Sequence, residues 1–136
     1  MTFDVPGIGI FVSALAGFFA SFFWFNEKTF FPVWWRAMGK GDQTPGNGQS
    51  MGILFGSALF STLAQAIVLA VLIGAAYADA TLQQGALVGL LVGVAIIGAA
   101  LGHRLFGGHG WKVWLLESGA DLLVIVVMGA VLSFWI

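Results

Sequence analysis

The sequence has 136 residues, of which 60% are hydrophobic and 8% are charged. In soluble globular proteins about 25% of residues are charged, so this composition indicates an integral membrane protein. The net charge of −1 and five Lys and Arg residues argue against nucleic acid as a partner, and the absence of cysteine excludes disulfides, thiolate metal sites and cysteine nucleophiles.

Four apolar runs are each long enough to cross a bilayer, which takes about 20 residues. They cover residues 7–25, 51–77, 84–106 and 112–135. We therefore predict an all-α, polytopic membrane protein in which four transmembrane helices form an antiparallel bundle. The chain is long enough for these spans and one sizeable loop, so a single domain over residues 1–136 is expected.

The first run follows a segment that contains Asp4 but no Lys or Arg. A secretory signal has a positive start, so this run is interpreted as a retained helix. Gly17 lies among small residues on one of its faces, which predicts close contact with another helix.

Residues 26–50 form one long loop, and its first part combines aromatic rings with a cation. These residues are Phe30, Phe31, Trp34, Trp35 and Arg36. Such a mixture is typical of a segment that lies at headgroup depth, and Pro32 suits the first turn of a short helix. We predict an interfacial anchor, with a groove for lipid or a partner protein as the less favoured alternative.

Glycines mark the helix faces that are expected to pack. Gly52 and Gly56 lie on one side of the second span, and Gly85, Gly89 and Gly93 follow at four-residue spacing in the third. This spacing is a moderately specific sign of close helix contact, either within one chain or between chains.

Two polar features accompany these glycines. At about 100° per residue, His103 falls at the angular position of Gly85, so the packed face of the third span is expected to end in a histidine. Ser57, Ser61 and Gln65 form a polar stripe on the second span, and Gln65 is interpreted as an interhelical hydrogen-bonding residue.

The cations predict the orientation of the chain. Lys28, Arg36 and Lys40 lie in the first loop, Arg104 and Lys112 flank the third, and the termini and second loop contain no Lys or Arg. The positive-inside rule therefore places the first and third loops in the cytoplasm and both termini outside.

Several stretches resemble a known family. They are Trp24-Phe25, the aromatic run Phe30 to Trp35 with Arg36-Ala37-Met38-Gly39 after it, and Met128-Gly129-Ala130-Val131-Leu132 with Trp135. The chain resembles, over nearly its whole length, the bacterial integral membrane proteins catalogued as domain of unknown function 1761. The resemblance implies a four-helix fold in the bacterial cytoplasmic (inner) membrane and no established activity.

Charged and ionisable residues gather around the third loop. This polar cluster consists of His103, Arg104, Lys112, Glu117 and Asp121. Glu117 and Asp121 are four residues apart and share one helix face, so both carboxylates are expected at or beneath the membrane surface. Carboxylates inside a membrane indicate a functional site by default and need a partner, and Arg104 or His103 is the expected partner of Glu117.

Three interpretations of the cluster remain open. An ion pair between Glu117 and Arg104 that locks two helices is favoured, proton or cation handling through both carboxylates is second, and a metal site that also uses His109 is the least favoured. No metal or cofactor is expected, and the sequence contains no motif of a hydrolase, zinc protease or nucleotide-binding enzyme.

We expect a non-enzymatic scaffold or accessory subunit that contacts membrane lipids. It would assemble through its glycine-rich helix faces, as a homo-oligomer or as part of a larger membrane complex. The alternative is a proton- or cation-coupled transporter or channel that uses Glu117 and Asp121.

Overall fold

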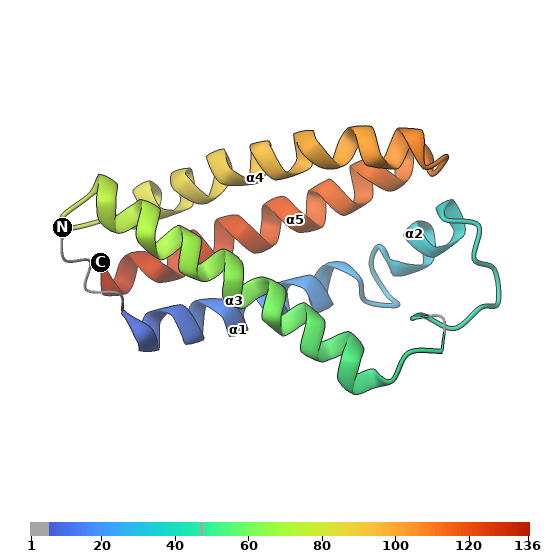
Figure 1. The fold of residues 1–136 in the computed structure, drawn as a ribbon, viewed down its shortest axis with the longest axis horizontal. Helices are drawn as coiled ribbons and strands as arrows, with labels where there is room; N and C mark the ends of the chain where they lie inside the picture. Colours follow the sequence, from blue (N-terminus) through green and yellow to red (C-terminus); the bar gives the residue numbers. More distant parts are fainter. Residues whose placement is uncertain (1–5, 47) are drawn as a thin grey trace.

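The computed structural model describes residues 6–46 and 48–136. Over these residues the chain forms α1 (Gly7–Trp24), α2 (Phe31–Ala37), α3 (Met51–Ala76), α4 (Leu82–Phe106), α5 (Gly110–Leu132) and the 3₁₀ turn η1 (Ser133–Trp135) (Figure 1). No strand occurs in these two ranges. Four of the helices, counting α5 with η1 as one, are long and apolar enough to cross a membrane, which confirms the predicted fold class.

Local sequence explains where the helices begin. The Ser50 side chain accepts a hydrogen bond of 3.2 Å from the amide of Ile53 and so caps α3. Thr81 and Gln84 form a reciprocal capping box, and α4 therefore begins at Leu82, two residues before the predicted start of the third span. In α2, Pro32 lies in the first turn, as expected.

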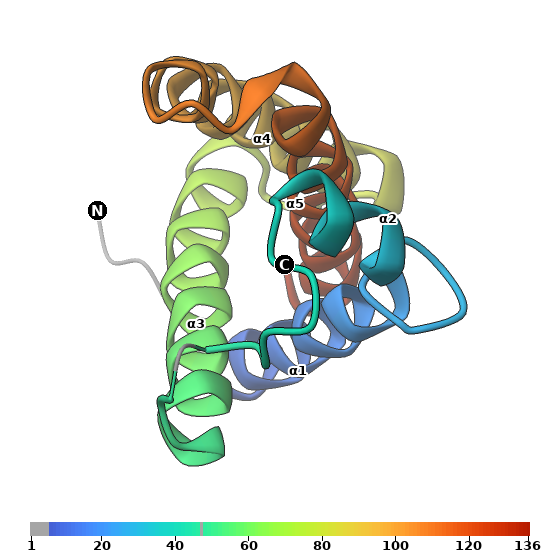
Figure 2. The same cartoon turned by 90° about the vertical axis from the view of Figure 1, so that its right-hand side faces the viewer.

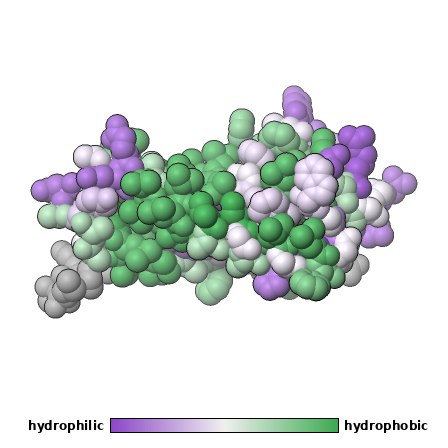
Figure 3. Space-filling view, turned by 90° about the horizontal axis from the view of Figure 1, so that it is seen from above, coloured by the Kyte–Doolittle hydropathy of each residue, from purple (hydrophilic) through white to green (hydrophobic). Residues whose placement is uncertain are grey.

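The long helices surround α5, which packs against α4, α1 and part of α3. α3 crosses the bundle diagonally, so its first half lies away from α4 (Figure 1). α2 covers the end of α5 that follows the third loop, as Figure 2 shows. On the face seen in Figure 3, hydrophobic residues cover most of the middle and hydrophilic residues gather toward both ends, as expected for a chain that spans a bilayer.

Close backbone contact joins α4 to α5. Gly85, Gly89 and Gly93 are the buried residues of α4. A Cβ atom on Gly85 would overlap the carbonyl oxygen of Gly129, and one on Gly89 would overlap the carbonyl oxygen of Ile125. The glycine spacing therefore marks a contact within the chain.

Contact between α1 and α5 also depends on small residues. The buried Ser13 hydroxyl donates a 3.0 Å hydrogen bond to the carbonyl oxygen of Met128. A Cβ atom on Gly17 would lie 2.7 Å from the Met128 side chain. Gly17 thus lies in a helix contact, as its sequence environment predicts.

Gly52 and Gly56 differ from this pattern. Neither has an atom of another helix within 4 Å of where its Cβ would be, because the first half of α3 lies away from α4 and packs on α1 through Phe55. The expected contact through these two glycines is absent from the described part of the chain.

Candidate functional site

Glu117 joins three helices at the end of the bundle that carries α2. Arg104 on α4 donates to both of its carboxylate oxygens, with 2.7 Å between Nε and Oε2, and forms an ion pair with it. Trp34 on α2 adds a hydrogen bond of 3.0 Å from its indole Nε1 to Oε1. The structure therefore contains the Arg104–Glu117 ion pair that the sequence favours.

This pair is only partly shielded from the surroundings, because the Arg104 and Glu117 side chains are 28% and 21% exposed. With three donors on its two oxygens, Glu117 is neutralised and held in one orientation. Its chemistry is therefore that of a structural anion, and it does not present a free carboxylate.

His103 does not take the place that helical projection predicts. It is exposed, and α4 instead turns Arg104 toward α5. The contact passes from Gly93 to Ile97, whose carbonyl oxygen accepts a 2.7 Å hydrogen bond from the Trp114 indole, and then to Arg104. From Gly85 to Ile97 the contact advances in four-residue steps, which drift about 120° around the helix, and seven residues after Ile97 this new face carries Arg104 and not His103.

Lys112 and His109 are also exposed and make no hydrogen bond or ion pair through their side chains with any described residue. Within residues 6–46 and 48–136, no three His, Asp or Glu side chains come close enough together to hold a metal ion. The structure thus assembles Arg104 and Glu117 from the predicted cluster and leaves His103, Lys112 and His109 apart.

Asp121 has a different environment from Glu117. It lies eleven residues after Gly110, which is about 16 Å along the helix and near the middle of a bilayer core of about 30 Å. Its side chain is exposed and makes no hydrogen bond with a described residue. Asp121 is therefore the carboxylate that remains available for proton or cation binding.

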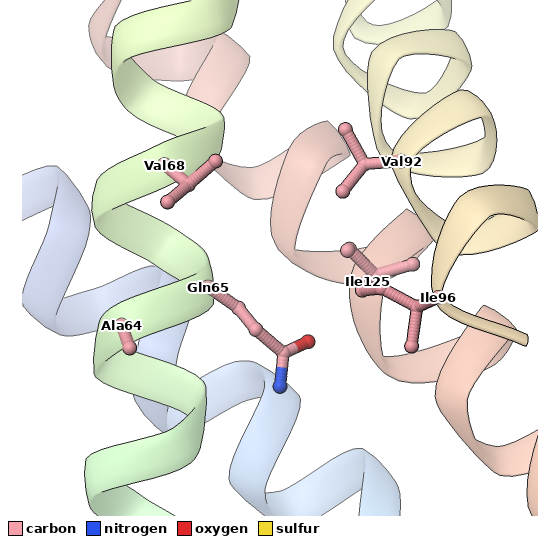
Figure 4. A pocket seen from close by; sticks show the side chains of 6 residues that line it. All are labelled: Ala64, Gln65, Val68, Val92, Ile96 and Ile125. Atoms are coloured by element: carbon pink, nitrogen blue, oxygen red, sulfur yellow. The ribbon is translucent and has the colours of Figure 1, made fainter. Parts of the chain in front are cut away.

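An apolar groove lies on the same face of α5. Between α3 and α4 is a pocket of about 210 Å³ lined by Ala64, Gln65, Val68, Val92, Ile96 and Ile125. Figure 4 shows the Gln65 side chain extending from α3 into this gap. Ile125 follows Asp121 by one helical turn, so Asp121 lies on the same side of α5, one turn closer to the α2 end.

Gln65 also departs from its expected role. Its side-chain nitrogen donates a 3.1 Å hydrogen bond to the Ser61 hydroxyl on the same helix. It makes no bond to another helix in the described part of the chain, because α3 and α4 are separated at this depth.

The aromatic residues of the first loop pack on one another and on the bundle. Phe30 stacks on Trp24, with ring centroids 4.3 Å apart, and Phe31 stacks on Trp35 at 5.4 Å. The Trp24 indole in turn donates a 3.0 Å hydrogen bond to the carbonyl oxygen of Leu116 on α5. The segment predicted as an anchor is thus fixed to α5 as well.

Sequence reasoning did not assign Trp34 and Trp24 to the site. The sequence predicts Trp34 as part of the interfacial anchor and assigns no role to Trp24, yet their indole N–H groups donate the hydrogen bonds that attach α2 and the end of α1 to α5. The chemistry of the indole indicates only that its N–H needs an acceptor when it leaves water, and it does not identify Glu117 as that acceptor.

Of the comparisons with known proteins, the one with protein families gives a match, and it adds no activity. No curated protein and no solved structure gives a match. The family described as Protein of unknown function (DUF1761) matches residues 8–133. These residues include all four candidate spans except the first residue of α1 and the last two residues of η1. The chain therefore belongs to the DUF1761 family of proteins of unknown function.

Proposed function

We propose that this protein is a non-enzymatic membrane subunit that assembles with further copies of itself through the groove between α3 and α4. The observation that supports this proposal is the exposure of Asp121 at mid-span, one helical turn from Ile125, which lines that groove. Outward-facing apolar side chains need no protein partner, because lipid tails are equally apolar. A carboxylate at this depth needs one, and no described residue supplies it.

The packing of the α4 glycines indicates which surface is left for contact with a second copy. Gly85, Gly89 and Gly93 are already used within the chain, so they are not available to a second copy. The open surface instead includes Gln65 and Val68 on α3. A helix seated in the groove would cover Val68 and Ile96, which are exposed, and would come close to Asp121 one turn along α5.

A bulky residue in the groove tests this assembly. Val68 lines the groove and is 51% exposed, whereas its neighbour Ile67 is 48% exposed and lies about 100° around the helix. We expect native mass spectrometry in lipid nanodiscs to show an oligomer for the wild type and Ile67→Trp, and a monomer for Val68→Trp. A monomeric wild type, or equal behaviour of the two variants, would contradict the proposal.

Proton or cation transport is the second candidate, and it is supported by the contrast between the two carboxylates. Glu117 is saturated by Arg104 and Trp34, while Asp121, one helical turn further along α5, is exposed and makes no hydrogen bond with a described residue. In an assembled protein the groove would be a path beside α5, along which Asp121 could bind and release a proton.

A flux measurement separates this candidate from a purely structural subunit. Proteoliposomes that contain a pH-sensitive dye would be given a potassium diffusion potential. Transport predicts proton uptake well above that of empty liposomes and a loss of at least about tenfold in Asp121→Asn, which retains the shape of the side chain but cannot ionise. Equal flux in the variant and wild type would exclude Asp121 as the transport site.

The proposed location is the cytoplasmic membrane of a bacterium, with the α2 end of the bundle in the cytoplasm. All five Lys and Arg residues lie at that end, three in the segment between α1 and α3 and two, Arg104 and Lys112, in the helix turns that flank the third loop, which supports this orientation.

A further inference from the structure

A polar hollow lies between α2 and the beginning of α5, separate from the Glu117 site and from the groove. It has a volume of about 450 Å³ and is lined by Val33, Arg36, Ala37 and Lys112. Its lining therefore combines two cations, one from each helix, with two small apolar side chains. No carboxylate lines it in the described part of the chain.

The two cations keep most of their hydrogen-bonding capacity. Arg36 uses Nε to donate a 3.2 Å hydrogen bond to the carbonyl oxygen of Pro32 on its own helix, so both terminal NH₂ groups remain available. The Lys112 ammonium makes no bond with a described residue. This contrasts with Arg104, whose guanidinium is occupied by Glu117.

The hollow also lies at the depth where lipid headgroups are found. Lys112 is the third residue of α5, only about 3 Å along the helix from its start. Beside it, α2 carries Trp34 and Trp35, and such rings prefer the boundary between headgroups and acyl chains. A ligand in the hollow would thus lie at headgroup depth, with its anion between the two cations and its apolar part beside Val33 and Ala37.

We propose that Arg36 and Lys112 form a binding site for the phosphate group of an anionic lipid headgroup. The guanidinium can contact two phosphate oxygens at once, and the ammonium adds a compact charge from the opposite wall. Basic pockets between membrane helices bind anionic headgroups by this chemistry. The volume exceeds that of a bare phosphate, which leaves room for the rest of a headgroup.

The test is a titration of the purified protein in neutral detergent with short-chain phosphatidylglycerol. Phosphatidylcholine of the same chain length is the zwitterionic comparison, and inorganic phosphate represents a soluble source of the same anion. Each cation is worth about 1 kcal/mol near an anionic lipid, which is roughly fivefold in Kd. Arg36→Gln and Lys112→Gln should therefore each weaken phosphatidylglycerol binding about fivefold, and the double variant about 20-fold or more.

Lys28→Gln is the matched control, since it removes the same charge from an exposed residue of the first loop that does not line the hollow. Its affinity should stay within about twofold of the wild type. Equal losses in Lys28→Gln and Arg36→Gln, equal binding of the two lipids, or no binding of phosphatidylglycerol or phosphate would overturn the proposal. If inorganic phosphate binds as well as phosphatidylglycerol and is weakened by the same two substitutions, the site stands and its ligand is a soluble phosphate.

This site goes beyond the proposed assembly, and the two can fail separately. Val68 lies in the groove and does not line the hollow, so Val68→Trp should bind phosphatidylglycerol like the wild type even as a monomer.

Discussion

Glu117 holds three helices together, because it belongs to α5 and accepts hydrogen bonds from Arg104 on α4 and Trp34 on α2. Asp121, one turn further along α5, makes no such bond in the described residues. Two carboxylates on one helix face therefore have opposite structural roles. Removing the first should affect stability, and removing the second should not.

A double-mutant cycle measures the first role. Arg104→Gln and Glu117→Gln should each lower the free energy of unfolding by about 2 kcal/mol, because the remaining charge is left half-buried without its partner. The double variant should lose less than the sum, with a coupling energy of about 1 kcal/mol or more. Glutamine at 117 retains an acceptor for the Trp34 indole, so the cycle isolates the charge.

Unfolding in mixed micelles, followed by circular dichroism, provides the measurement. Asp121→Asn is the control and should change stability by less than about 0.5 kcal/mol. Strictly additive losses at 104 and 117 would show that the ion pair does not form in the membrane protein.

Sequence reasoning could pair Arg104 with Glu117 because both lie near the ends of successive antiparallel helices and carry opposite charges. It could not add Trp34, which is 83 residues away from Glu117 along the chain. Nothing in the aromatic pattern of the first loop indicates which helix end lies beneath it. That contact depends on the path of the chain between α1 and α3.

At the scale of the helices, the glycines on α4 have two kinds of environment, one packed against another helix and one open. Gly89 lies against the backbone of α5, whereas Gly98 has no neighbour within 4 Å of its missing Cβ. The same substitution should therefore have opposite effects at the two positions.

Gly89→Ala should lower the free energy of unfolding by about 2 kcal/mol or more, because the new methyl group meets the carbonyl of Ile125 and α4 must shift. Gly98→Ala should leave it unchanged or raise it by up to about 1 kcal/mol, since alanine favours the helix. Comparing the two variants in the same micelles removes effects of the detergent. A similar loss in both would mean that α4 does not pack on α5 as described.

The spacing of Gly85, Gly89 and Gly93 predicted a close contact, and the structure supplies its partner, α5. Projection at 100° per residue could not predict that the contact ends at Arg104 and not at His103. It gives the faces of one helix, while the crossing of two helices decides how a contact moves from one face to the next. For the same reason the divergence of α3, which leaves Gly52 and Gly56 uncovered, was not predictable.

For the whole molecule, the distribution of Lys and Arg along the chain predicts the orientation in the membrane most directly, since these cations occupy only one end of the bundle. The chain has no cysteine, so single cysteines can report on it without background. Thr44 lies in the first loop and Asp79 in the second, and both are exposed.

An impermeant maleimide should label Asp79→Cys in intact spheroplasts and Thr44→Cys only after lysis, because the first loop is expected in the cytoplasm. Labelling in lysed cells is the control for reactivity of each cysteine. The reverse pattern would place the α2 end outside and contradict the positive-inside assignment.

The reciprocal contact of Gly85 and Gly129 has an evolutionary consequence. A Cβ at either position would overlap the other's carbonyl oxygen, which every amino acid carries, so no replacement at one can compensate for a change at the other. Gly17 instead faces the flexible side chain of Met128, which can exchange volume with it. Among homologues, the first pair should therefore remain fixed together, while the second should vary in a correlated way.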